Sequence, residues 1–400
     1  MTSVLLGIIY LAFISLGLPD GLLGSAWPSM YGELGASVSW AGIVSMIISA
    51  GTIVSSLASD RVTKRFGAGM VTAVSVCMTA VSLFGFSMSS AFWQLCLWTV
   101  PYGLGAGSVD AALNNFVAIH YPARHMSWLH CMWGIGASIG PVIMGAAITG
   151  GFGWTGGYRI IALMQVVLTA VLFFSLPLWK KHKAENSGGT SEESVGNLTF
   201  KQIIRRPGVR EVMVCFFCYC AAECTAGMWA ASYCTFNRGI TPEQAASFAS
   251  LFYIGITAGR FVSGFLTIWI NDKNMIRLGE VIIVIGIAVL MIPQNIFLPV
   301  GLVLIGCGCA PIYPSIIHST PKNFGVELSQ SMIGIQMASA YVGACLMPPV
   351  FGLVADYIDI GFFPLFILAI IVLMIVMAER LNRKWLWKSI GCAKTSRSAR

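Results

Sequence analysis

Charged residues are scarce in this sequence. They make up 10% of the 400 residues, whereas hydrophobic residues make up 56%. Because soluble domains carry about 25% charged residues, this composition excludes a large soluble enzyme. The chain also lacks a His-Glu-x-x-His metal motif and any convincing pairing of a nucleophile with a base. We therefore expect neither an enzyme nor a bound metal.

Long apolar runs recur along the chain, and each has the roughly 20 residues that a helix needs to cross a bilayer. Because lipid offers the backbone no hydrogen-bond partners, such runs must be helical. We predict an all-α polytopic membrane protein with twelve transmembrane helices in two six-helix, pseudo-symmetric bundles. The predicted spans are residues 4–26, 38–58, 69–88, 92–118, 128–150, 158–178, 209–235, 244–270, 276–293, 296–318, 330–354 and 361–379.

The chain has a net charge of +8, and its basic residues are unevenly distributed between the loops of the two membrane sides. If the helices alternate in direction, all Lys and Arg except Arg159, Arg238 and Arg260 fall on one side. By the positive-inside rule, we expect both termini in the cytoplasm and the protein in the plasma membrane. The basic excess then reflects topology, and no nucleic-acid partner is expected.

A polar stretch, AENSGGTSEESVGNLT, separates six spans from six. We predict an N-terminal bundle at 1–178, a cytoplasmic linker at 179–208, a C-terminal bundle at 209–379 and a basic cytoplasmic tail at 380–400. The halves are weakly similar: GTIVSSLASD (51–60) resembles GRFVSGFLTI (259–268), and YGLGAG (102–107) resembles IGCGCA (305–310). Such repeats are typical of secondary transporters.

Few ionisable residues lie deep in the spans. We single out Asp20, Asp110, Glu223 and Arg260. A charge at the bilayer centre costs at least ~2.5–3.5 kcal/mol, so four of them indicate a polar path. Asp20 lies between Pro19 and Gly21, which weaken its helix. We interpret it as a proton carrier, and the alternative is a helix-terminal acid at the outer interface.

Asp110 and Asn114 lie four residues apart and therefore share a helix face. Their carboxylate and amide suit a polar ligand such as a sugar. The alternative for Asp110 is an internal ion pair with Arg260. Glu223 is a second proton site, a substrate ligand or the partner of Arg260. Trp133 either stacks on a sugar or fills a helix interface.

The segment SLASDRVTKRFG (56–67), after the second span, resembles the cytoplasmic loop motif of the major facilitator superfamily. Ser56 and Thr63 stand where that motif has glycine. The charged residues that match the motif are Asp60, Arg61, Lys64 and Arg65. The resemblance implies that these charges form a cytoplasmic gate. It also agrees with the twelve spans, the 6+6 repeat and the central linker.

Within that superfamily, GLGAGSVDAALNN and the following WLHCMWGIGASIGP resemble the fucose-permease-like branch of proton-coupled sugar transporters. The resemblance implies acids in the first and fourth helices for proton coupling and sugar binding, which here are Asp20 and Asp110. The fourth-helix acid is Asp where the fucose permease has Glu. The fifth-helix asparagine has no clear counterpart, because that region offers His130 and Trp133. We expect an interfacial role for His130.

A second resemblance leaves export as an alternative direction of transport. Gly136, Gly140, Pro141 and Gly145 resemble the glycine-rich motif of proton-coupled drug exporters of the same superfamily.

Together these observations predict a monomeric secondary transporter that moves a small, polar, sugar-like solute by alternating access. Its partners would be that solute and the bilayer, and a proton gradient would supply the energy without a cofactor. The alternatives are a proton-coupled drug or metabolite exporter and a non-transporting membrane sensor. The predicted proton-coupling residues are Asp20, Asp110 and Glu223. The predicted substrate-binding residues are Asp110, Asn114, Trp133, Glu223 and Arg260.

Overall fold

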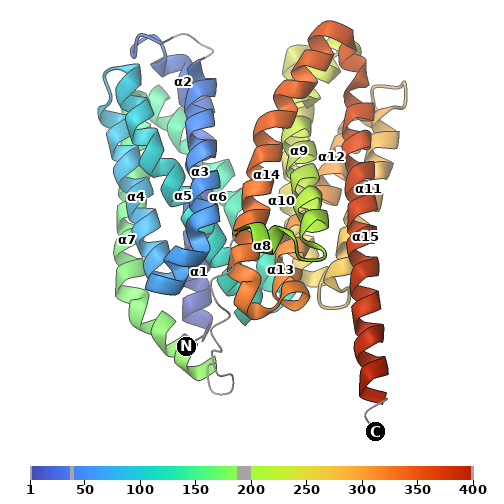
Figure 1. Cartoon of the computed structure of the whole chain (residues 1–400). Coiled ribbons are helices and arrows are strands. Elements are labelled where there is room, and N and C mark those ends of the chain that lie inside the picture. The colour runs from blue at the N-terminus through green and yellow to red at the C-terminus, as the bar shows by residue number, and fades with distance from the viewer. Residues whose placement is uncertain (1, 37–39, 187–199, 398–400) are drawn as a thin grey trace. The chain divides into compact units, whose positions relative to one another are not determined.

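The computed structural model describes residues 2–36, 40–186 and 200–397, and within these ranges the regular structure is helical throughout (Figure 1). The first seven helices are α1 (Thr2–Gly17), α2 (Leu22–Met30), α3 (Ala41–Phe66), α4 (Ala68–Met88), α5 (Phe92–His120), α6 (Ala123–Thr149) and α7 (Gly153–Asn186). They are followed by α8 (Phe200–Ile204), α9 (Val209–Ser232), α10 (Pro242–Leu266), α11 (Asp272–Leu290), α12 (Phe297–Cys309), α13 (Ile312–Phe324), α14 (Val326–Val354) and α15 (Phe363–Arg397). Short π-helical turns at Tyr233–Asn237 and Ala355–Asp359 extend α9 and α14.

The chain divides into two compact units, which we describe separately. The first comprises residues 1–120 and 128–194, and the second comprises residues 121–127 and 195–400. Helix α7 continues past the predicted bundle end at 178 as far as Asn186, and α15 continues the last span through most of the predicted tail. The central part of the predicted linker, residues 187–199, lies outside the described residues. The predicted bundle boundaries stay predictions.

The all-helical polytopic fold is confirmed. In the described parts of the chain, nine segments are long and apolar enough to cross a membrane by length and composition. One of them, Val326–Lys384, contains two predicted spans. Helices α5 and α11 are not among the nine: α5 carries buried polar residues, and α11 has four charged residues within its first nine positions. Both were predicted as spans, and with them the described helices supply all twelve.

The two halves repeat the same packing between their second and fourth spans. A Cβ atom on Gly103 of α5 would lie 2.6 Å from the carbonyl oxygen of Ile48 in α3. A Cβ atom on Gly306 of α12 would collide with the carbonyl oxygen of Phe252 in α10. Since both glycines hold the second position of the similar segments 102–107 and 305–310, the weak sequence repeat corresponds to a repeated close helix contact.

Helices α1 and α6 approach closely through small residues. A Cβ atom on Gly136 would collide with the Ile14 carbonyl oxygen, and one on Gly140 with the Leu18 carbonyl oxygen. Gly145 has open space where a Cβ atom would be. Two glycines of the exporter-like motif therefore have a packing role against α1.

The charged segment after the second span is helical, so its description as a loop was wrong. Helix α3 continues to Phe66 and ends at Gly67, whose φ of 82° suits a residue without a side chain. Lys64 donates to Asp60 over 3.0 Å, one helical turn away. This i,i+4 pair favours helix over loop at these positions.

Candidate functional site

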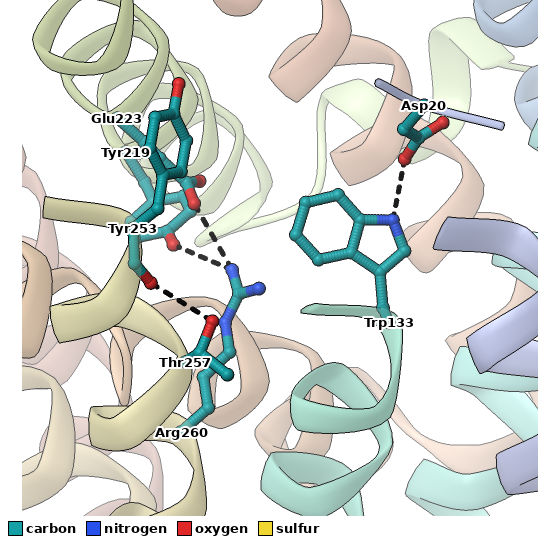
Figure 2. Close-up of polar contacts among 7 residues, drawn as sticks. All are labelled: Asp20, Trp133, Tyr219, Glu223, Tyr253, Thr257 and Arg260. Carbon is teal, nitrogen blue, oxygen red and sulfur yellow. Dashed lines mark hydrogen bonds and ion pairs between the residues drawn. The ribbon is translucent and has the colours of Figure 1, made fainter. Parts of the chain in front are cut away.

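Asp20 lies at a break in the first span. Helix α1 ends at Gly17 and α2 begins at Leu22, and Pro19, which has no N–H to donate, lies between them. The Asp20 side chain is exposed, and its Oδ2 accepts a hydrogen bond of 2.7 Å from Trp133 Nε1 of α6 (Figure 2). The structure therefore joins two predicted site residues, one from the helix break and one from α6.

Asp110, Asn114 and His130 form a buried polar chain between α5 and α6. Their exposed fractions are 6%, 0% and 5%. Asn114 Nδ2 donates to Asp110 Oδ1 over 2.7 Å and to the Asp110 carbonyl oxygen over 3.0 Å. His130 Nε2 lies 3.0 Å from Asn114 Oδ1. Because an amide oxygen only accepts, Nε2 carries the hydrogen in this arrangement, and the chain of donors points toward Asp110.

The helix hairpin turns the His130 ring inward, so the structure buries a side chain for which the sequence predicted an interfacial role. Asn114 and His130 lie at similar distances in sequence from the turn at Tyr121 and Pro122. In an antiparallel hairpin such residues meet at the same level, which is the signal that could have identified the pair. The imidazole also packs edge-on against Phe13 of α1, with ring centroids 5.4 Å apart.

Asp20 and Asp110 belong to the same unit and interact electrostatically. The buried Tyr102 of α5 also interacts electrostatically with Asp20. The first unit therefore holds two carboxyl groups within each other's field, each with a neutral N–H donor as a hydrogen-bond partner.

The second unit holds the buried Arg260 of α10, which is 3% exposed. Its Nη2 lies 3.2 Å from Glu223 Oε1 and 3.4 Å from the Tyr219 hydroxyl, both on α9 (Figure 2). The side chain of Glu223 is 17% exposed. Of the three roles predicted for Glu223, the structure shows one, the ion pair with Arg260. Tyr219 in turn packs edge-on against Tyr313 of α13, at 5.7 Å between ring centroids.

The four predicted gate residues lie in the last turns of α3. The Asp60–Lys64 ion pair joins residues of one helix, and the Lys64 side chain is 49% exposed. Arg61 is exposed, and the Arg65 guanidinium lies 5.3 Å from the ring centroid of Phe66. Asp60 Oδ1 is buried without a hydrogen-bond partner. The role of these residues as a gate stays a prediction.

Glu280 is a buried acid that the sequence interpretation passed over. It is 3% exposed on α11, close to the start of the predicted span 276–293. That depth is typical of an interfacial residue, and it is the packing of α11 in the folded unit that buries the side chain. In the described residues no group of three His, Cys, Asp or Glu could hold a metal ion.

An all-helical chain with two repeated units, each with buried polar side chains on helices that can span a membrane, has the construction of a polytopic transporter. A model of the Major Facilitator Superfamily matches residues 9–239 and 212–400. The chain belongs to this superfamily, and it is an integral membrane transporter of small solutes and not an enzyme.

Two curated relatives are similar over most of their length. Bypass of stop codon protein 6 of Saccharomyces cerevisiae is 22% identical over 88% of this chain and 77% of that protein. The cis,cis-muconate transport protein of Acinetobacter baylyi is 21% identical over 88% of this chain and 87% of that protein.

The solved structure of the E. coli fucose:proton symporter FucP has the same fold. It superimposes with a TM-score of 0.78 over 95% of this chain and 98% of that one, at 16% sequence identity. This likeness confirms the predicted fold and the fucose-permease-like architecture.

Proposed function

We propose that this transporter couples the movement of a small, polar, sugar-like solute to the movement of protons. The supporting observation is the type of hydrogen-bond donor that lies beside each acid of the first unit. Asp20 accepts from the Trp133 indole and Asp110 accepts from the Asn114 amide, and both donors are neutral.

A carboxyl group beside a neutral donor can gain and lose a proton, whereas one beside a guanidinium group is held in its charged form. Asp20, exposed at the helix break, would load and release the proton. Asp110 and Asn114, on one face of α5, would bind substrate hydroxyl groups.

Coupling then requires that proton and solute favour the same states of the carrier, since otherwise neither gradient could drive the other. The halves would alternate access by rocking around the site. The carrier would lie in the plasma membrane as a monomer with both termini in the cytoplasm. The charges of Asp60, Arg61, Lys64 and Arg65 would hold the cytoplasmic side in one conformation. No cofactor is needed, because the proton gradient supplies the energy.

Arg260 favours a second candidate, a solute that carries a carboxylate. Guanidinium groups bind carboxylates through two parallel hydrogen bonds. Arg260 contacts Glu223 through one nitrogen at 3.2 Å, so a solute carboxylate could compete for the guanidinium group. One relative is named for the transport of muconate, a carboxylate anion.

Proteoliposomes that contain the full chain and a trapped pH dye test these candidates. Neutral sugars, a hexuronate, muconate and cationic drugs are added in turn. We expect proton entry with a neutral sugar in the wild type and its loss in Asp20→Asn and Asp110→Asn. The exposed Asp356→Asn is the matched control and should behave as the wild type does.

Proton entry only with hexuronate or muconate would favour the carboxylate candidate. Proton movement that follows only the addition of drugs would contradict both and move the protein to the exporters. A response that survives both acid-to-amide substitutions would contradict the assignment of the proton to the first unit.

A further inference from the structure

Glu280 on α11 is a buried carboxyl group that the proposed transport mechanism does not use. The residue is 3% exposed, and its Oε1 is buried without a hydrogen-bond partner in the structure. A carboxylate in such a place is costly because it has left water without gaining a full set of donors. The neutral acid costs much less, so the site has a physical reason to bind a proton.

The two charged residues that act electrostatically on Glu280 form an ion pair that joins α11 to α15. Arg277, one turn before Glu280, donates from Nε to Glu379 Oε1 over 2.6 Å and from Nη2 to Glu379 Oε2 over 2.8 Å. Glu280 interacts electrostatically with both residues. Arg277 thus pairs with Glu379, whose side chain is 34% exposed, and lies one helical turn from the buried Glu280.

The other helices packed on α11 contribute few competing charges near Glu280. Helix α9 presents the buried Cys215 thiol, which interacts electrostatically with Glu280. Helix α12 has no charged residue. On α13, His318 lies 2.9 Å from Asp272, at the first turn of α11. Within the described residues, Arg277 is thus the cation beside Glu280 that the structure shows to interact with it.

We propose that Glu280 is a proton-binding site that controls the ion pair between α11 and α15. With the proton bound, Glu280 is neutral and Arg277 binds Glu379 through both oxygens. When the proton leaves for water, the new carboxylate competes for Arg277, which lies within reach on the same helix face. The bridge to Glu379 then weakens, so the proton sets how firmly α15 is held to α11.

This site does not rest on the proposed transport function, because neither Asp20 nor Asp110 takes part in it. It can therefore be tested on the purified full-length protein without a known solute. Infrared spectra report the carbonyl band of a neutral carboxyl group, and thermal unfolding reports stability, from about pH 5 to about pH 8. The variants are Glu280→Gln and, as a matched control, Glu211→Gln, whose carboxylate binds Lys384 between α9 and α15.

The pH dependence of stability follows from the number of protons that the folded and unfolded chains bind. The folded chain holds a proton on Glu280 that the unfolded chain releases, so stability falls as pH rises through the titration of the buried group. One such proton changes the folding equilibrium by up to about tenfold per pH unit. We expect Glu280→Gln to lose this fall and the part of the carbonyl band that Glu280 contributes, seen in the difference spectrum against the wild type, and Glu211→Gln to keep both. Unchanged behaviour in Glu280→Gln would overturn the proposal.

A second variant decides the matter if Glu280→Gln does not fold. Glu379→Gln removes the competing carboxylate and leaves Arg277 to Glu280, so the carbonyl band should disappear at lower pH than in the wild type. A band that titrates at the same pH in Glu379→Gln and in the wild type would overturn the link between the proton and the ion pair.

Discussion

The two units hold their interior acids in different ways. In the first unit, Asp20 and Asp110 accept hydrogen bonds from an indole and an amide. In the second unit, Glu223 accepts from a guanidinium group. The two halves share the same helix packing, yet their chemistry differs. A few side chains decide whether an interior acid has a neutral or a charged partner.

One position of the repeat shows this difference directly. Thr52 and Arg260 hold the second place of the similar segments 51–60 and 259–268. Thr52 is buried, and its hydroxyl donates to the Ile48 carbonyl oxygen over 2.8 Å. Arg260 at the equivalent place is buried with an acid beside it. The acids of the first half thus have neutral hydrogen-bond partners, whereas the second half holds an ion pair.

Removal of the buried cation should have the largest effect on stability. Arg260→Met leaves Glu223 without its guanidinium partner, and breaking a buried pair costs about 3–5 kcal/mol. The double variant Arg260→Met with Glu223→Met should recover most of that loss in thermal unfolding. Equal destabilisation of the single and double variants would show that packing, and not charge, accounts for the effect.

The hydrogen-bonded chain of the first unit should give a smaller effect. His130→Leu leaves the buried Asn114 Oδ1 without the donor seen in the structure, at a cost of about 1–3 kcal/mol. His130→Gln carries a replacement donor and should be closer to the wild type in chemical unfolding. If the two variants were equally unstable, the hydrogen bond to Asn114 would not be the reason.

Thr52→Val probes the repeat position without a change in charge. The substitution removes a hydroxyl donor but leaves a carbonyl that a helix backbone can satisfy, so we expect a loss of less than about 1 kcal/mol. A loss as large as that of Arg260→Met would contradict the distinction between the halves.

The exposed ion pair in α3 should matter least. Lys64→Gln breaks the i,i+4 pair with Asp60, and such surface pairs contribute about 0.3–0.5 kcal/mol. We expect the unfolding temperature to stay close to that of the wild type. If transport nevertheless slows, the gate interpretation gains support; unchanged transport as well as stability would count against it for Lys64.

The helical spans could be predicted because lipid imposes one solution on long apolar runs. Helices α5 and α11 are harder to predict by this rule, because their polar residues lower the hydropathy that identifies the other spans. Spacing along one helix was enough to join Asp110 to Asn114. His130 needed the antiparallel pairing of α5 with α6, and Glu280 needed the packing of neighbouring helices that buries it at a shallow depth.

The sequence by itself determined the helical membrane fold, its two related halves of six spans each and the choice of interior acids, because hydrophobic length and the rarity of charge are properties of composition and order. Only the tertiary structure decided the partners of those acids: an indole for Asp20, an amide for Asp110 and a guanidinium group for Glu223. Those contacts join different helices, and their geometry depends on how closely glycines let the helices approach and on how each helix is rotated about its axis. A sequence pattern predicts the helix face on which a side chain lies, but helix packing decides which side chains that face contacts.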